Sequence, residues 1–360
     1  MNTPSRLSQV WVIARLQLRR VFFSKRSFWV YILALFPAVM FFAHGLESTL
    51  QRQGWASQTT PPAILESIRE GDTDEEVLLR AGTPIRDDSH RPRRNRNGED
   101  VEEPERRYMM YFDGARRWHL NFEAGVLHNT SSELLLNLEE DRQVFAGVFQ
   151  YFYLRLAIFF GCLGIFMNLF RGEMLDKTLH FWFLAPARRE VLLAGKYLAG
   201  LIAAVLIFTA GASLCFLAML WPHDAVTVDA FWREQGFSHL FWYAASVALA
   251  CVGYGSVFLA AGLLLRNPII PAVVILFWES LNGILPAALQ KLSVLYYVQS
   301  LAPVPPPMDP NAPALIQLLV SPADPPSTAA AVFGLLGVTA LVLWAAARAV
   351  QRIEINYGTD

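Results

Sequence analysis

A charged segment between two apolar stretches, residues 171–197, holds the side chains whose types and spacing stand out most. These side chains are Glu173, Lys177, Thr178, Leu179, Pro186, Arg188, Arg189 and Lys196. The residues from Glu173 to Phe183 predict a short amphipathic helix, which Pro186 ends. A rigid, charged projection of this kind is suited to receive force from another protein. An ordinary basic loop between two membrane spans is the alternative.

Two ionisable residues lie within apolar stretches, where charge is rare and often functional. Arg155 falls within residues 148–170, and Glu279 falls within residues 268–288. A charged arginine at the centre of a bilayer costs roughly 2.5–3.5 kcal/mol, and less near the surface. Arg155 therefore either reaches toward the bilayer surface or belongs to a polar pathway. Glu279 faces a polar cavity or a dimer interface, or it starts a re-entrant segment near water.

No arrangement of residues in the sequence predicts an enzyme. The seven histidines are scattered without metal-binding spacing, and no Gly-x-x-x-x-Gly-Lys-Ser/Thr motif for nucleotide phosphates occurs. Cys162, Cys215 and Cys251 lie in apolar stretches, where a thiol usually serves as a small hydrophobic side chain. We therefore predict no catalytic, metal or cofactor site on this chain.

The elements that must position these residues are long apolar segments. Hydrophobic residues make up 54% of the chain and charged residues only 17%, against roughly 25% in soluble domains. Six segments are apolar over about 20 residues, which matches a hydrocarbon layer about 30 Å thick. They are residues 27–45, 148–170, 198–220, 240–265, 268–288 and 328–347. The prediction is an α-helical polytopic membrane protein with about six transmembrane helices and a small α+β domain inserted after the first.

The distribution of basic residues predicts the orientation of these spans. Residues 1–26, 171–197 and 348–360 are rich in Arg and Lys, whereas the opposite short loops hold only Arg233 and Lys291. Because basic segments remain in the cytoplasm, both termini are predicted to be cytoplasmic and residues 46–147 extracytoplasmic. The net charge of −1 gives no overall attraction to nucleic acid.

The segment before the first span predicts a helix at the membrane surface. Within residues 1–26, apolar side chains recur at one helical spacing, at positions 7, 10, 11, 14, 18 and 22. Arg15 and Arg19 fall away from that face. A cationic helix lying in the interface fits this pattern, and a basic flank that only sets orientation is the alternative.

Residues 46–147 predict a small domain of two helices and three strands. A helix is expected over residues 64–70, and a capping box at Thr73–Glu76 predicts a second helix, which Gly82 and Pro84 end. Strands are expected over residues 108–112, 116–122 and 126–131, with Asp113-Gly114 as a hairpin turn. Residues 86–107 are too polar to bury a core and predict a disordered insert.

This order of elements resembles the BamE/SmpA-like lipoprotein domain of bacterial envelopes. The resemblance rests on the phrase from Ile68 to Val77, on Gly82-Thr83-Pro84 and on the late aromatic hairpin. It covers about 65 residues and implies an interaction module, through which an envelope protein would bind.

A proline-rich segment, residues 289–327, follows the fifth predicted span. Its prolines exclude a continuous helix, so the fifth span is expected to end in broken or re-entrant pieces near Pro286. We predict that this re-entrant segment lies on the extracytoplasmic side of the membrane.

The membrane portion as a whole resembles a type-2 ABC transporter permease. In that family the second span leads into a loop with the pattern Glu-x-x-x-x-Thr-Leu, then Pro, Arg-Arg and Gly-Lys. The matching residues here are Glu173, Thr178, Leu179, Pro186, Arg188, Arg189, Gly195 and Lys196. The resemblance implies a coupling loop for a separate ATP-binding subunit, which would carry the ATP and Mg, and a homodimer or heterodimer with a similar permease in the cytoplasmic (inner) membrane.

Two functions therefore remain open at the level of sequence. The first is the permease subunit of an ATP-driven exporter. The second is a membrane-anchored envelope scaffold whose outer domain is the functional part. An integral-membrane enzyme is a third reading, which the absence of polar clusters disfavours. Alanine substitutions in the 171–197 loop discriminate the first two, because a scaffold has no use for these residues.

Overall fold

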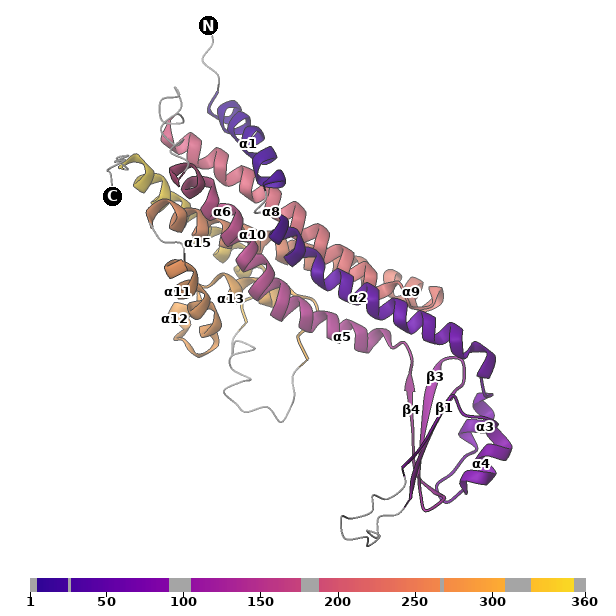
Figure 1. Cartoon of the computed structure of the whole chain (residues 1–360). Coiled ribbons are helices and arrows are strands. Elements are labelled where there is room, and N and C mark those ends of the chain that lie inside the picture. Colours follow the sequence, from indigo (N-terminus) through magenta and orange to yellow (C-terminus); the bar gives the residue numbers. More distant parts are fainter. Residues whose placement is uncertain are drawn as a thin grey trace, which may run out of the picture. The chain divides into compact units, whose positions relative to one another are not determined.

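The computed structural model describes residues 5–24, 27–90, 105–175, 188–265, 269–307 and 325–352. The chain forms two compact units. The first comprises Met1–Phe41, Arg142–Met219 and Ala225–Asp360, and the second comprises Phe42–Asp141 and Leu220–Asp224. We refer to them as the helical unit and, after the location predicted from the sequence, the outer domain (Figure 1).

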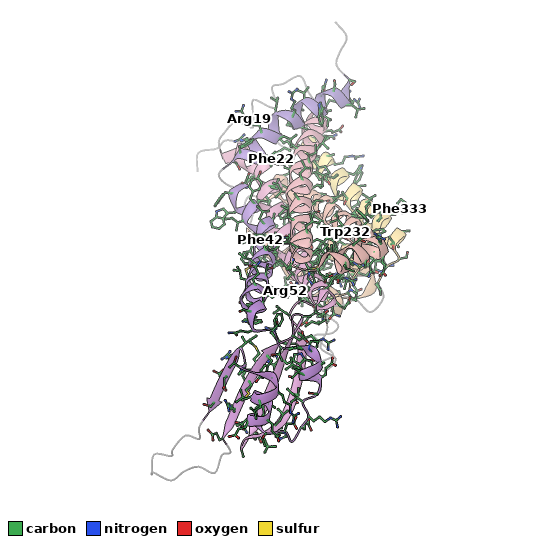
Figure 2. The ribbon with its side chains drawn as sticks, turned by 90° about the vertical axis from the view of Figure 1, so that its right-hand side faces the viewer. Arg19, Phe22, Phe42, Arg52, Trp232 and Phe333 are labelled. Atoms are coloured by element: carbon green, nitrogen blue, oxygen red, sulfur yellow. The ribbon has the colours of Figure 1, made fainter. Side chains whose placement is uncertain are left out.

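Five helical segments are long and apolar enough to cross a membrane. They are α2 (Ser27–Trp55), α5–η2–α6 (Leu138–Val148, Phe149–Ala157, Ile158–Leu175), α8 (Arg189–Leu220), α9–η3–α10 (Ala225–Phe231, Trp232–Gly236, Phe237–Leu264) and α15 (Thr328–Gln351). Large apolar side chains remain exposed on them, such as Phe333 at the periphery of the helical unit (Figure 2). The chain is a helical, multi-pass membrane protein with a small α+β part.

The predicted span 268–288 differs from the other five. Helix α11 (Ile269–Ser280) has only 12 residues, a length of about 18 Å, which is too short for a hydrocarbon layer of about 30 Å. The chain then forms η4 (Asn282–Ile284), α12 (Ala287–Gln290), α13 (Val294–Val298) and η5 (Gln299–Leu301). The expected break near Pro286 is present, but it begins earlier, at Leu281. Among the described residues, five helical segments are therefore long and apolar enough to cross a membrane, against the six predicted.

The long helices also extend beyond the predicted spans. Helix α2 continues ten residues past residue 45, and α8 begins at Arg189 rather than at residue 198. Hydropathy marks only the apolar part of a helix, whereas the backbone hydrogen bonds continue through its polar ends. Inside the helical unit, α2, η2 and α8 meet at Ala34. Its carbonyl accepts from the Tyr153 hydroxyl at 2.9 Å, and it would contact any side chain at Gly211.

The outer domain has the predicted second helix and hairpins, whereas the first helix, expected over residues 64–70, ends earlier, at Glu66. Helices α3 (Pro62–Glu66) and α4 (Asp74–Ala81) accompany an antiparallel sheet of order β1-β2-β3-β4. Strand bounds are β1 Arg86–His90, β2 Arg106–Phe112, β3 Arg116–Glu123 and β4 Val126–Leu134. The capping box at Thr73 and Glu76 is confirmed. The core is formed by Leu65, Ile68, Val77, Met109, Tyr111, Trp118, Leu120, Phe122 and Leu127.

Strand β1 corrects the prediction that residues 86–107 form a disordered insert. Residues 86–90 pair with β2, and β2 itself begins at Arg106. Composition suggested disorder because these residues bury little apolar surface. They are held instead by the strand pairing and by Arg107, whose guanidinium contacts Asp87 and Asp74, both at 2.7 Å. Residues 91–104 lie outside the described part of the chain.

Helix α1 (Arg6–Phe23) confirms the predicted N-terminal helix, and the face that it buries in the protein overlaps only in part with the predicted apolar face. The buried residues are Ile13, Ala14, Gln17 and Val21, whereas Leu7 and Trp11 of the predicted face are exposed. The difference arises because α1 packs on α8, where Ile13 lies against Val191 and Leu192. A spacing pattern alone cannot tell which of two overlapping faces meets a neighbouring helix.

Candidate functional site

The ends of the 171–197 segment meet at a buried ion pair. The Lys196 ammonium lies 2.5 Å from the Glu173 carboxylate, and the side chains are 0% and 2% exposed. Glu173 belongs to the last turns of α6, and Lys196 lies two turns into α8. Lys196 also donates to the Leu169 carbonyl at 2.6 Å, which places a cation at the negative end of α6.

Helix α1 joins this pair through two side chains. The Gln17 amide donates to Glu173 at 2.8 Å, although the two residues are 156 positions apart in the chain. The guanidinium of Arg20, one turn further on, lies 3.6 Å from the same carboxylate oxygen. The three helices α1, α6 and α8 therefore meet at one carboxylate, which we call the Glu173 junction and define as Gln17, Arg20, Glu173 and Lys196.

Gly195 allows α1 to approach the junction. A Cβ atom at this position would lie 2.7 Å from the Ile13 side chain and 3.1 Å from the Val10 carbonyl. The first distance is shorter than Cβ contacts normally reach and the second is tighter than most, so glycine permits this close crossing of α1 and α8 (Figure 1). The Gly195-Lys196 step thus has two structural roles: the first residue admits α1, and the second pairs with Glu173.

The adjoining basic residues connect the start of α8 to the end of α15. Arg189 donates to the carbonyls of Val350 and Gln351, at 3.3 and 3.1 Å. A cation at the last carbonyls of a helix satisfies acceptors that lack partners within the helix. Arg188 is exposed just before α8. Lys177, Thr178, Leu179 and Pro186 lie outside the described residues.

The second predicted polar residue, Glu279, caps a short helix. Its carboxylate accepts from the Ser293 hydroxyl at 2.6 Å and from the amides of Val294 and Leu295 at 3.0 and 3.1 Å. These amides are the first of α13, so the carboxylate satisfies the end of a buried helix. The geometry gives Glu279 a structural role in capping α13, and the expected roles in a polar cavity, a dimer interface or a re-entrant segment stay predictions.

Arg155 lies within the π-helix η2, and its guanidinium is 5.3 Å from the centre of the Tyr151 ring. It also lies within electrostatic range of Glu279. The structure therefore places the two predicted intramembrane charges in one region of the helical unit.

Sequence reasoning missed Gln17 and Ser293. Gln17 is a polar residue on the face of α1 that also carries Ile13, Ala14 and Val21. The available signal was a glutamine among apolar residues at helical spacing. The stronger apolar pattern on the neighbouring face of the helix, which includes Leu7 and Trp11, obscured it. Ser293 stands in a segment where proline and short helices leave no periodicity to interpret.

The outer domain contains charge pairs on its surface rather than a recognisable site. Hydrogen bonding to Arg107 lowers the pKa of Asp87 from its usual value. Burial raises the pKa of Tyr111 to about 12. In the described part of the chain, no group of three or more His, Cys, Asp or Glu side chains is arranged to hold a metal ion.

Comparison of the chain with protein-family models, with curated proteins and with solved structures finds no match.

Proposed function

We propose that this chain is the membrane-spanning subunit of an ATP-driven exporter that resembles the type-2 ABC permeases. One observation carries the proposal: the Glu173 junction ties both ends of the 171–197 segment to the amino-terminal helix. A force applied to that segment would reach α1, α6 and α8 together, because all three share one buried carboxylate. Transport coupled to a separate ATPase requires a connection of this kind.

The proposed topology places the junction on the cytoplasmic side. The basic segments 1–26, 171–197 and 348–360 support cytoplasmic termini, with residues 46–147 outside the inner membrane. A separate ATP-binding subunit, which carries ATP and Mg, would then bind the 171–197 segment. A second permease chain, identical or similar, would complete the transporter.

Purification of the intact protein in a mild detergent tests the proposal. We expect an ATP-binding subunit with a phosphate-binding loop to co-purify, and its ATP hydrolysis to depend on the permease. The variants Glu173→Gln and Lys196→Met should reduce that ATPase activity at least tenfold, with less subunit retained. Glu47→Gln and Lys291→Met, which change exposed residues of the same types, are the matched controls. Full activity in both junction variants would contradict the proposal.

The alternative is a membrane-anchored envelope scaffold. The outer domain favours it, because this domain has its own hydrophobic core and a complete four-stranded sheet. Under that alternative, alanine at Thr178 or Pro186 changes no activity, and removal of the outer domain removes all of it. The exporter proposal expects the opposite for the loop variants.

A further inference from the structure

A cavity of about 230 Å³ lies beside the Glu173 junction, between α1, α2 and α6. Its walls are side chains of the helical unit alone. They are Gln17, Arg20, Val21, Ser24, Ser27, Val30, Gly164, Ile165, Asn168, Leu169, Gly172 and Glu173. The position matters because α1 carries arginines while α2 begins an apolar span, so the cavity lies where a charged surface meets an apolar one.

The two parts of this lining differ in polarity. Arg20, Ser24 and Asn168 contribute charged or hydrogen-bonding groups, whereas Val30 and Ile165 are apolar. The amino-terminal end of α2, at Ser27, also borders the cavity. The Ser27 amide already donates to Ser24, so the helix contributes through its positive dipole end, which favours an anion nearby. A ligand that fits the whole lining carries an anionic group at one end and hydrocarbon at the other.

The charges around the cavity favour a phosphate group. Glu173 is the one carboxylate in the lining, and its two oxygens accept from Lys196 at 2.5 Å and from Gln17 at 2.8 Å. Two cations, Arg20 and Lys196, thus accompany one anion. The Arg20 side chain is 54% exposed. Because a guanidinium has five N–H donors in a fork, it can contact both Glu173 and a phosphate oxygen.

Two glycines of α6 keep the cavity open. A Cβ atom at Gly164 would meet only Val30, at an ordinary contact distance of 3.9 Å, and one at Gly172 would meet nothing within 4 Å. Other glycines of the same helix are closely packed: a Cβ atom at Gly161 would lie 2.1 Å from the Phe208 ring. The space at Gly164 and Gly172 is therefore a local feature and not a general looseness of α6.

From these observations we infer that the cavity binds the phosphate-bearing headgroup of a phospholipid. The phosphate lies at Arg20 and the amino-terminal end of α2, and an acyl chain runs along Val30 and Ile165. A bound lipid fixes Arg20 beside Glu173 and so stabilises the packing of α1 on α6. This site is independent of the transported substrate, and the inference does not require that the chain is an exporter.

Thermal unfolding of the purified full chain in detergent tests this inference with three probes. Short-chain phosphatidylglycerol carries both phosphate and acyl chains, diacylglycerol of the same chain length lacks the phosphate, and glycerol phosphate lacks the chains. A ligand that binds only the folded state raises the unfolding temperature, and above its Kd the increase grows with the logarithm of the ligand concentration. We expect such a concentration-dependent increase with phosphatidylglycerol alone. An equal increase with diacylglycerol or with glycerol phosphate would overturn the proposed ligand.

Variants then locate the site. Gly164→Leu fills the cavity, and Arg20→Gln removes the cation, so each should weaken the phosphatidylglycerol response at least tenfold. Gly337→Leu is the matched control, because a Cβ atom there also meets nothing within 4 Å, in another helix away from the cavity. A wild-type response in Gly164→Leu would overturn the inference.

A measurement on the unchanged protein covers the case in which Gly164→Leu does not fold. A phospholipid with a photoreactive acyl chain is cross-linked to the wild-type chain, and the labelled peptides are identified by mass spectrometry. Labels within residues 27–36 of α2 or 158–172 of α6 support the site. Labels confined to other helices exclude it.

Discussion

A carboxylate and an ammonium group removed from water carry a large desolvation cost, which only close pairing offsets. At the Glu173 junction the distances of 2.5 Å to Lys196 and 2.8 Å to Gln17 provide that pairing. The loss of one partner leaves the other charge buried. Glu173 and Lys196 are therefore more sensitive to substitution than the small number of their contacts suggests. Substitution of one of them should be more destabilising than substitution of both.

Lys196→Met removes the close, buried cation of Glu173 and leaves only the half-exposed Arg20, at 3.6 Å. Removal of one member of a buried pair typically costs about 3–5 kcal/mol, so we expect a clear fall in the free energy of unfolding. Denaturant unfolding of the chain in detergent measures it. The double variant Glu173→Gln with Lys196→Met should recover part of the loss, because no unpaired charge remains. A double variant as unstable as the sum of the two singles would contradict a direct pairing.

The stability of the outer domain should depend on pH through the titration of Asp87. Its pKa is lowered in the folded state by the hydrogen bond to Arg107. The stabilisation is therefore complete above the unfolded pKa of about 3.8 and is lost as the pH falls through the lowered folded value. Both side chains are partly exposed, so the effect is at most about 1 kcal/mol. Hydrogen exchange of the β1 amides, corrected for the intrinsic rate at each pH, should show a larger loss of protection between pH 6 and about pH 3 in the wild type than in Asp87→Asn.

Among the helices, the contacts of α1 show how much the sequence determines. The existence of the helix follows from its spacing pattern, and its start follows from Ser5, whose hydroxyl accepts from Ser8. The face that α1 buries depends on Gly195, 182 residues beyond Ile13, and no local pattern contains that information. The same holds for the candidate site: Glu173 and Lys196 were found from a loop motif, whereas Gln17 required the packed structure.

Gly195→Ala should displace α1 from α8. The added methyl group would lie 2.7 Å from Ile13, and overpacking of this kind typically costs about 1–3 kcal/mol. A cysteine pair placed across α1 and α8 should then cross-link more slowly than in the parent protein. Gly54→Ala in α2 is the control, because a Cβ atom there meets nothing within 4 Å. Unchanged cross-linking in Gly195→Ala would show that α1 does not pack as described.

The short helix α13 depends on one side chain in the same way. Glu279→Gln replaces one carboxylate oxygen by an amide NH₂ group, which can only donate. The groups that face it, from Ser293, Val294 and Leu295, are donors as well, so at least one hydrogen bond is lost. We expect a loss of about 1–3 kcal/mol, confined to the segment from residue 281 to residue 301. We expect faster hydrogen exchange at the amides of Val294 and Leu295 and unchanged exchange in the long helices. Equal protection in both proteins would exclude the capping role.

At the scale of the whole molecule, the sequence predicted the division into membrane helices and a folded insertion, because hydropathy and charge are separated along the chain. Thirty-three of the 61 charged residues lie between Gly45 and Gly147. The number of spans was harder to predict. An apolar stretch such as residues 268–288 has the right length for a membrane helix, and its early end at Ser280 depends on how Glu279 binds the segment that follows.

The proposed orientation gives a prediction for the intact protein in cells. Single cysteines at residue 95 and at residue 180 should differ in their reaction with a membrane-impermeant maleimide added from outside. We expect rapid labelling of the first, and labelling of the second only after the membrane is opened. The three native cysteines are buried and serve as the unlabelled background. Labelling of residue 180 in intact cells would reverse the topology and remove the exporter proposal.

The contact between Glu173 and Lys196 also has an evolutionary consequence. Because the two residues close the chain on itself at the membrane end, the intervening residues form a cassette with a fixed base. Lengthening such a closed loop adds little entropic cost, about 0.6 kcal/mol for each doubling. Insertions, deletions or whole exchanges of the cassette should therefore be tolerated without a shift in helix register. Under the proposed exporter function, specificity for the ATP-binding subunit can then diverge by exchange of this segment alone, while the membrane helices stay unchanged.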